Sequence, residues 1–356
     1  MTSGDRIRLV VLFGGQSAEH DVSRVSALHV LGAVDRDRYE VAPIGITRDG
    51  RWVPMPDALE PGARALPSPD GSPVEAEIEP LPAVSGEGGE QVVVLPLLHG
   101  PMGEDGTVQG LCELAGVPYV GAGVAASAVC MDKALAKSVL DGAGIAQCKW
   151  IGVRESDVDD EFVDRVEREL GYPAFVKPAN LGSSVGVTKA DDREALEAAL
   201  ATAFRYDEFA VVEEGVTARE IEVAVLGNAR PKASIPGEIV PGNDFYDYDD
   251  KYVTDGADLR IPADLSPDEV AAVQRLAVEA YRALRVDGMA RVDFFYEEGG
   301  RGWLVNELNT IPGFTPISMY PKLWEASGIG YAELVDELVR LAVERHDRRT
   351  RFSREH

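Results

Sequence analysis

Cysteine and long apolar runs are both scarce in this sequence. The three cysteines lie far apart and no Cys-x-x-Cys spacing occurs, which excludes zinc and redox motifs of that kind. We expect Cys112, Cys130 and Cys148 each to be a small buried residue in a protein of the reducing cytoplasm. No apolar run reaches about 18 residues, so no membrane span is expected. Residues 1–8 are polar and do not resemble a signal peptide.

Positive charge is also in short supply. The chain has 35 Lys and Arg against 61 Asp and Glu, which gives a formal net charge of -26. This balance argues against nucleic acid or an anionic membrane surface as a partner. An anionic ligand would be repelled at long range. Any phosphate site must therefore be built locally, from cationic side chains, backbone N–H groups and metal ions.

Strand and helix patterns alternate along the 356 residues, which is typical of an α/β protein of two or three domains. Apolar runs predict strands at 7–13, 41–46, 92–98, 147–153, 174–177, 210–213, 220–226, 289–296 and 302–308. Helical patterns cover 23–31, 107–115, 134–140, 161–170, 192–204, 267–285, 319–326 and 331–345. We place domain boundaries after residues 121 and 212, which gives domains 1–121, 122–212 and 213–356.

Three segments fit neither pattern. Residues 54–90 are rich in Pro, Gly, Ala and Glu and are predicted to be an irregular excursion with weak structure. Residues 241–258 are polar and aromatic and show neither the helical nor the strand period. This pattern favours a functional loop that acts as a lid. The charged tail from Arg345 onward is predicted to be a frayed, solvated end.

The predicted hairpin carries the strongest local signal. Strand side chains alternate between faces, so Arg291 and Asp293 should share a face with Glu307 and Asn309. Two carboxylates and an amide oxygen suit magnesium, with phosphate oxygens completing its shell. An exposed strand face with an ordinary salt bridge is an equally good interpretation of the spacing. We expect four residues to point toward the core instead: Val292, Phe294, Val305 and Leu308.

Two loops and two isolated residues add weaker signals. The loop LGSSVG (181–186) follows the strand that carries Lys177, and its small residues would let backbone N–H groups approach an anion, although such a loop is more often a simple turn. Glu19 follows the first strand in GGQSAEH (14–20), where it could cap a helix or receive an ammonium group. His99 by itself is usually structural. Lys133 begins a helix, a position that disfavours a cation and hints at an anionic ligand.

Taken together, these motifs resemble the D-alanine–D-alanine ligase family of the ATP-grasp superfamily. The resemblance runs from Leu9 to about Leu341 and is interrupted only at 54–90. The motifs are FGGQSAEHDVS (13–23), LHGPMGEDG (98–106), MDK (131–133), VKP (176–178), GSSVG (182–186), FYDYDDKY (245–252), RVD (291–293) and NELNTIPGFT (306–315). Each motif alone is weak, but all of them in this order are highly specific.

The resemblance implies a three-domain ATP-grasp fold. It has an N-terminal Rossmann-like substrate-binding domain, a central domain and a C-terminal catalytic domain, with ATP between the last two. It also implies ATP-dependent ligation of two D-alanine molecules through a D-alanyl phosphate, for peptidoglycan precursors. Phosphoryl transfer of this kind depends on positioning and charge neutralisation. The implied ligands of two Mg²⁺ ions, with Mn²⁺ as an alternative, are Asp293, Glu307 and Asn309. A homodimer is implied as well.

The resemblance also implies roles for single residues. The implied nucleotide contacts are Lys133, Lys177, Ser183, Ser184, Glu213, Glu214, Val216, Glu220 and Lys251. The implied oxyanion donors are Arg291 and the N–H of Gly313. Glu19, with His99 nearby, would receive the ammonium of the first D-alanine. Ser318 and Met319 would hold the carboxylate of the second.

Substrate selectivity would depend on Tyr252, which forms a hydrogen-bonded triad with Ser183 and Glu19 in the family. Relatives that make D-alanyl-D-lactate lack this tyrosine. Glu214 departs from the lysine of many relatives, and Met319 departs from a common leucine, which excludes D-serine less firmly. The alternatives are therefore a D-alanyl-D-lactate or D-alanyl-D-serine ligase of the same fold, and a non-catalytic nucleotide-binding protein.

Overall fold

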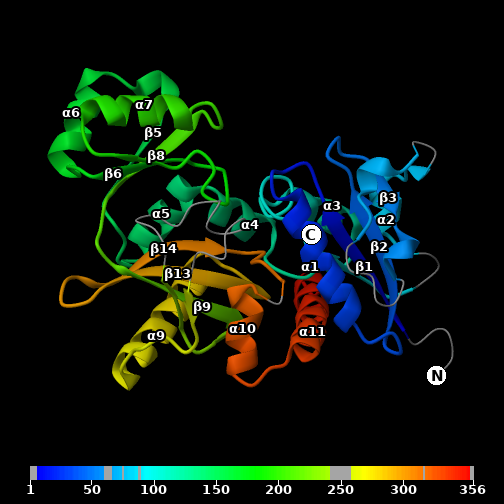
Figure 1. Ribbon diagram of the computed structural model, residues 1–356. Helices are drawn as coiled ribbons and strands as arrows, with labels where there is room; N and C mark the ends of the chain where they lie inside the picture. The colour runs from blue at the N-terminus through cyan, green and yellow to red at the C-terminus, as the bar shows by residue number, and fades with distance from the viewer. Residues whose placement is uncertain are drawn as a thin grey trace.

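The computed structural model describes residues 6–59, 66–73, 76–86, 90–240, 258–315 and 317–352. The described chain forms three sheets covered by helices (Figure 1). The predicted division into domains after residues 121 and 212 stays a prediction. None of the described helices is both long and apolar enough to cross a membrane.

The first sheet has the strand order β3-β2-β1-β4. Its strands are β1 (Ile7–Gly14), β2 (Tyr39–Ile46), β3 (Trp52–Pro54) and β4 (Val92–Pro96). Strands β2 and β4 run parallel to β1, as the continuous apolar runs predicted. Helix α1 (His20–Ala33) packs on β1, and α3 (Thr107–Ala115) follows β4. The carboxyl ends of β1 and β4 therefore lie side by side, and Glu19 and His99 follow these ends.

The prediction of weak structure for residues 54–90 was wrong for part of the stretch. It contains the short helix α2 (Pro80–Val84) and two single turns, η1 (Pro56–Leu59) and η2 (Pro69–Gly71). Ala83, Val84 and Leu66 are buried. The stretch packs because its few apolar residues cover the first sheet. Pro69, for example, lies so close to β2 that a Cβ added to Gly45 would be 2.8 Å from the Cβ of Pro69.

The second sheet is antiparallel with the order β5-β8-β6-β7. Its strands are β5 (Trp150–Arg154), β6 (Ala174–Pro178), β7 (Thr188–Ala190) and β8 (Phe209–Glu214). Helices α6 (Asp160–Glu169) and α7 (Arg193–Ala203) share its core. Asp159 and Asp192 cap these helices by accepting hydrogen bonds from backbone N–H groups, which explains where each helix begins.

The third sheet has the order β12-β11-β9-β13-β14, with β10 beside β9. Its strands are β9 (Arg219–Leu226), β10 (Lys232–Ala233), β11 (Gly237–Val240), β12 (Asp258–Arg260), β13 (Met289–Glu297) and β14 (Gly302–Asn309). Its core includes α9 (Pro267–Ala283), which begins in a capping box of Ser266 and Glu269. Helices α4 (Val124–Met131), which the sequence analysis missed, and α5 (Lys133–Gly142) contribute to the same core.

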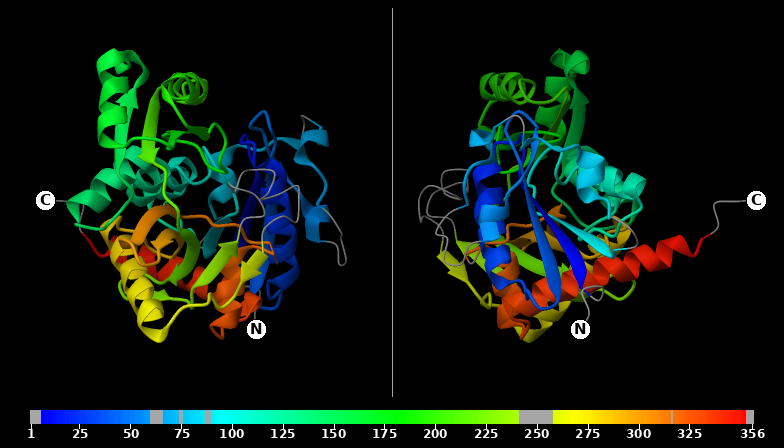
Figure 2. Two further views of the ribbon diagram at one scale, coloured as in Figure 1. Left: turned by 60° about the vertical axis from the view of Figure 1, so that its left-hand side comes forward. Right: turned by 90° about the vertical axis from the view of Figure 1, so that its right-hand side faces the viewer.

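Helices α10 (Met319–Ala326) and α11 (Tyr331–Thr350) end the fold. The buried face of α11 joins the first sheet to the third, because one core cluster contains Leu9, Leu226 and Leu338 (Figure 2). The helix α11 therefore shares a hydrophobic core with the strand β1.

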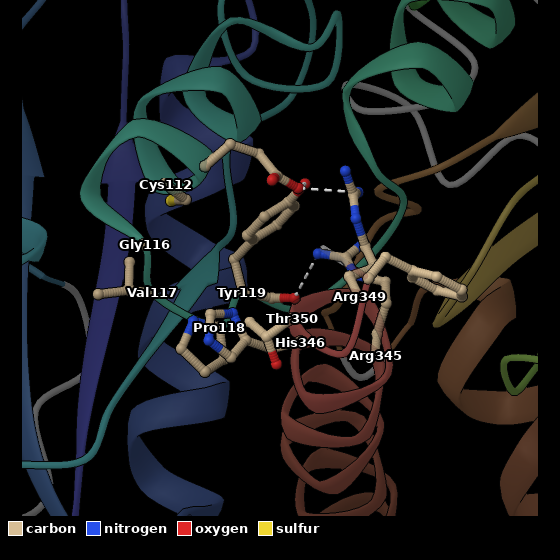
Figure 3. A pocket seen from close by; sticks show the side chains of 11 residues that line it. Cys112, Gly116, Val117, Pro118, Tyr119, Arg345, His346, Arg349 and Thr350 are labelled. Atoms are coloured by element: carbon tan, nitrogen blue, oxygen red, sulfur yellow. Dashed lines mark hydrogen bonds and ion pairs between the residues drawn. The ribbon is translucent and has the colours of Figure 1, made fainter. Parts of the chain in front are cut away.

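The predicted frayed, solvated tail from Arg345 was wrong in part: α11 continues to Thr350 and Arg345 is buried, whereas residues 349–352 are exposed. Arg345 is 3% exposed, and its guanidinium lies 3.9 Å from the centroid of the Tyr119 ring. It donates hydrogen bonds of 2.5 Å to the carbonyl oxygen of Gly121 and of 3.1 Å to that of Tyr119. Figure 3 shows Arg345 beside Tyr119. Arg345 and Tyr119 border a cavity of about 430 Å³. A charged sequence can be buried where backbone carbonyls and an aromatic ring replace water.

Candidate active site

The hairpin of β13 and β14 brings four predicted residues onto one face. Arg291 lies opposite Asn309 and Asp293 lies opposite Glu307. Arg291 donates two hydrogen bonds of 2.7 Å to the two oxygens of Asp293, and the Asn309 amide donates one of 2.9 Å to Asp293 Oδ2. The prediction that the two strands pair and that these four residues share one face is confirmed, whereas their roles stay predictions.

A β-bulge makes this arrangement compatible with the core. The register changes from Asp293–Glu307 to Phe294–Val305, which leaves Asn306 as an extra residue in β14. Strict alternation would place Val305 on the same face as Glu307. The bulge turns the Val305 side chain to the opposite face. The four apolar residues predicted to face inward are therefore all buried: Val292, Phe294, Val305 and Leu308.

Glu222 is a site residue that the sequence analysis missed. It lies on β9 opposite Asp293, is 6% exposed, and places Oε2 3.0 Å from Arg291 Nε. Burial alone would lower the pKa of Arg291, but the Asp293 and Glu222 carboxylates raise it above its usual value. The guanidinium is therefore a fixed cation. The sequence feature that could have identified Glu222 was its position two residues after Glu220.

The donor set at this hairpin fits a hard divalent cation. Asp293, Glu307 and Asn309 offer carboxylate and amide oxygens, which suit magnesium. In the part of the chain that the structure describes, no three His, Cys, Asp or Glu side chains form a complete metal cage. A cation here would therefore need oxygens from a ligand or from water, as is usual where magnesium binds together with phosphate.

Three lysines border the same region from other elements. Lys133 and Lys137 lie four residues apart on α5, and Lys177 lies on β6. Together with Glu213 and Glu307, these lysines line one small cavity. The Lys133 ammonium donates to the Leu181 carbonyl, and burial together with nearby Lys177 lowers its pKa. A neighbouring anion would be stabilised by this group of cations.

Glu213 is buried between two of these lysines. Its Oε1 lies 3.1 Å from Lys137 Nζ and its Oε2 lies 2.9 Å from Lys177 Nζ. Burial raises the pKa of this carboxyl, but Lys137 and then Lys177 outweigh that effect and lower it to about 2. Lys137 was missed in the sequence. The available signal was a second lysine one helical turn after Lys133, because like charges at that spacing repel unless an anion lies between them.

The other residues of the predicted adenosine site follow Glu213. The Glu214 carboxylate accepts a 2.7 Å hydrogen bond from the Lys149 N–H and an ion pair of 2.5 Å from Arg301. Its side chain therefore stabilises the end of β8, where the Glu214 N–H also donates a 3.0 Å hydrogen bond to the Lys149 carbonyl. Val216, in the segment that leads into β9, and Glu220, the second residue of β9, are both half-buried.

The GSSVG loop contains an uncommon turn. The φ angles of Ser183 and Ser184 are 52° and 58°, and the Val185 N–H donates a 3.2 Å hydrogen bond to the Gly182 carbonyl. Two successive non-glycine residues in the left-handed region cost about 1 kcal/mol each or more. Backbone strain of this kind is most common at ligand sites. Here it directs the Ser183 hydroxyl toward the Glu19 carboxylate, to which it donates a hydrogen bond.

His99 connects the first sheet to the third. Its Nδ1 lies 3.1 Å from the Ile311 carbonyl oxygen, so Nδ1 must carry the proton and donate. Burial lowers the pKa of His99 and favours the neutral ring, although the Glu19 carboxylate acts in the opposite direction. The Ser26 hydroxyl then donates to His99 Nε2 at 3.4 Å and accepts from the Phe314 N–H at 3.4 Å.

Glu104, which the sequence analysis also missed, contacts the backbone N–H of Ile311, whereas His99 contacts its carbonyl oxygen. Its carboxyl accepts a 2.7 Å hydrogen bond from the Gly100 N–H and another from the Ile311 N–H. Loss of hydration, and then the charge of Glu19, raise its pKa to about 8. His99 and Glu104 thus fix the peptide that lies two residues before Gly313.

Gly313, Ser318 and Met319 are closely packed against their neighbours. A Cβ on Gly313 would lie 2.8 Å from Ser318 Oγ, which in turn is 2.8 Å from Thr315 Oγ1. Met319 is 5% exposed, and its Sδ would meet a Cβ on Gly237 at 2.8 Å. The Met319 side chain therefore packs in the core. The predicted Lys251, Tyr252 and lid at 241–258 lie outside the described residues, apart from Asp258, which begins β12.

Comparisons with known proteins agree along nearly the whole chain. The sequence matches the family models "D-ala D-ala ligase N-terminus" over residues 8–122 and "D-ala D-ala ligase C-terminus" over residues 139–340. It is 47% identical to a D-alanine–D-alanine ligase of Clostridium acetobutylicum, over 96% of this chain and 99% of that protein. It is also 47% identical to one of Bacillus cytotoxicus, over 96% of this chain and 97% of that protein.

Solved structures give the same result. The D-alanine-D-alanine ligase of Coxiella burnetii aligns with a TM-score of 0.81 at 36% identity, covering 98% of this chain and 97% of that one. The VanG D-Ala:D-Ser ligase of Enterococcus faecalis aligns with a TM-score of 0.83 at 33% identity, covering 95% of this chain and 99% of that one.

Proposed function

The chain belongs to the D-alanine–D-alanine ligase family and is an ATP-dependent ligase, and on that premise we propose how its residues form D-alanyl-D-alanine. The reaction joins two D-alanine molecules for peptidoglycan precursors. The observation that carries the assignment is the cavity shared by Lys133, Lys177 and Glu307. It brings cations suited to phosphate next to a carboxylate suited to a divalent metal.

The first step needs a carboxylate and a phosphate to meet. In our proposal Glu19 receives the ammonium group of the first D-alanine, with His99 beside it. The carboxylate of this substrate then attacks the γ-phosphorus of ATP, and the bond from that phosphorus to the bridging oxygen of ADP breaks. Lys133 and Lys177, with Lys251 from outside the described residues, neutralise the phosphate charge. Two Mg²⁺ ions, or Mn²⁺, on Asp293, Glu307 and Asn309 would supply further charge neutralisation when bound.

The second step forms the peptide bond. The amine of the second D-alanine attacks the carbonyl carbon of D-alanyl phosphate, and inorganic phosphate leaves from the tetrahedral intermediate. We assign the oxyanion to Arg291 and the N–H of Gly313. Each such donor contributes about 3–4 kcal/mol to lowering the barrier. Asp293 and Glu222 hold Arg291, and the contacts of His99 and Glu104 with Ile311 support the loop that carries Gly313.

We assign the remaining predicted residues as follows. Glu213, Glu214, Val216 and Glu220 border adenosine, with Ser183 and Ser184 near the phosphates. Ser318 and the backbone at Met319 hold the second substrate's carboxylate. Closure of the lid excludes water, which would otherwise hydrolyse the acyl phosphate. A homodimer, the absence of nucleic acid as a partner and a cytoplasmic location are further proposals that rest on the family resemblance and on charge.

The competing assignment is D-alanyl-D-serine ligation, because one solved relative is named a D-Ala:D-Ser ligase. The higher identity to the D-alanine–D-alanine ligases favours D-alanine in both positions. The deciding experiment measures phosphate release from ATP and magnesium with D-alanine, and with D-alanine plus D-serine or D-lactate, and resolves the products by mass. D-alanyl-D-alanine from D-alanine alone supports the proposal. Release only in a mixed pair would move the assignment to that pair.

A further inference from the structure

Lys137 is a buried charged residue that the proposed mechanism does not use. It is 2% exposed and lies on α5, four residues after Lys133. Its ammonium is 3.1 Å from Oε1 of Glu213, which is 3% exposed. A lysine is rarely buried to this extent unless it is paired. The pair lies at the small cavity that Lys133, Lys177 and Glu307 also line, where we place the phosphate groups of ATP. This position indicates a functional role for the pair.

The charges of Glu213, Lys137 and Lys177 do not sum to zero. Two ammonium groups, those of Lys137 and Lys177, share a single carboxylate. Lys133 adds a third positive charge at the same cavity, and Glu307 a second negative one. The group therefore carries an excess positive charge, although the chain as a whole carries -26. A buried excess of charge is unfavourable until a counter-ion of opposite sign arrives.

The position of Lys177 explains what Lys137 contributes. If Glu213 had only Lys177 as its partner, the carboxylate would neutralise that ammonium and reduce its attraction for phosphate. Lys137 supplies a second partner to the other carboxylate oxygen, so part of the Lys177 charge stays available. Lys137 is the less accessible of the two lysines, because its side chain is 3% exposed against 14% for Lys177 and its ammonium lies against Glu213.

We propose that Lys137 is a positioning residue that balances the charge of Glu213 and so keeps Lys177 available to the phosphate groups of ATP. The inference rests on the proposed function, because it deepens the role of the same nucleotide site. It has a specific consequence. Lys137 should matter for ligands that carry phosphate, and much less for a nucleoside that lacks it.

The test compares ATP with adenosine. Lys137→Met removes the charge but keeps most of the chain length, whereas Lys137→Arg keeps the charge. Lys189→Met is the matched control, because Lys189 is exposed and pairs with Asp191, also on the surface, at 3.1 Å. Affinity for MgATP and for adenosine is measured by calorimetry on the full chain, together with KM for ATP and for D-alanine.

We expect Lys137→Met to weaken MgATP binding by about tenfold or more, with a matching rise in the KM for ATP. Adenosine affinity and the KM for D-alanine should change by less than about threefold. Lys137→Arg should retain most of the ATP affinity, and Lys189→Met should behave like the wild type. Equal losses for ATP and adenosine, or no loss for either, would overturn the inference and leave Lys137 as a structural residue.

A second variant keeps the test decisive if Lys137→Met folds poorly. Lys137→Met combined with Glu213→Gln removes one positive and one negative charge, so the net charge of Lys137, Lys177 and Glu213 stays that of the wild type. Because the competing carboxylate is gone, the ratio of ATP affinity to adenosine affinity should return toward that of the wild type. A ratio that stays as low as in Lys137→Met contradicts the proposal. Failure of the wild type itself to form dipeptide would instead contradict the proposed function.

Discussion

The Ser183 hydroxyl donates a hydrogen bond to the Glu19 carboxylate, across 164 residues of sequence. This contact links the loop after β6 to the loop after β1. Glu19 is 8% exposed, so its charge has little access to water and depends on such donors. The contact therefore organises the pocket in which we place the first substrate.

Replacing Ser183 with alanine should impair D-alanine more than ATP. Without the hydroxyl, Glu19 loses a donor and the strained turn loses its anchor. We expect the KM for the first D-alanine to rise by about tenfold, which corresponds to roughly one charge-assisted hydrogen bond. Steady-state kinetics with D-alanine and ATP varied separately measure this split. Ser138→Ala, on the exposed face of α5, is the control. An increase confined to the KM for ATP would contradict the assignment.

Tyr252 should control the choice of nucleophile. It lies outside the described residues, but Ser183 and Glu19, its two expected partners, are in contact. We expect Tyr252→Phe to gain D-alanyl-D-lactate formation while it keeps part of its dipeptide activity, because the hydroxyl that favours an amine is removed. Mass-resolved products from D-alanine mixed with D-lactate measure the change. Unaltered selectivity would remove Tyr252 from the specificity assignment.

Arg345 should contribute strongly to stability. Arg345→Met leaves the buried carbonyls of Tyr119 and Gly121 without their donor and removes the contact with the Tyr119 ring. We expect a loss of about 3 kcal/mol in the free energy of unfolding in urea. Arg351→Met, which changes an exposed arginine near the end of the same segment, should cost less than about 0.5 kcal/mol. Equal losses in the two variants would show that the buried contacts add nothing.

Arg345 also illustrates what the sequence could not predict. A run of charged residues at a chain end usually stays solvated, and the sequence does not indicate that two carbonyls and an aromatic ring will replace the water. The same limit applies to Lys137, Glu222 and Glu104. Each of them acts through a partner on another element, so its role follows from tertiary packing and not from its neighbours in the chain.

The hairpin residues were predictable for the opposite reason. Arg291 and Asp293 share a face because strand periodicity is local, and the short turn after β13 brings Glu307 opposite Asp293. The bulge at Asn306 has no comparable local signal. The buried strands and the helices α3 and α10 were likewise predictable, because apolar periodicity determines them, whereas α4 was missed because its residues are apolar on nearly every side.

Glu104 should make the stability of the metal-free protein depend on pH. Its pKa is raised from the usual value of 4.5 to about 8, so the folded state holds a proton that the unfolded state releases. The stability that this group contributes is present below about pH 4.5. It is lost as the pH rises toward about 8, at up to about 1.4 kcal/mol per pH unit.

Glu104→Gln tests this directly, because the amide still accepts hydrogen bonds from Gly100 and Ile311 but cannot titrate. Urea unfolding at several pH values between about 5 and 8, without divalent ions, should give a shallower decline in the variant than in the wild type. Glu279→Gln, at an exposed carboxyl on α9, corrects for the general repulsion in so acidic a chain. If Glu104→Gln and Glu279→Gln give parallel curves, Glu104 is ionised in the folded state, and its hold on Ile311 is that of an ordinary carboxylate.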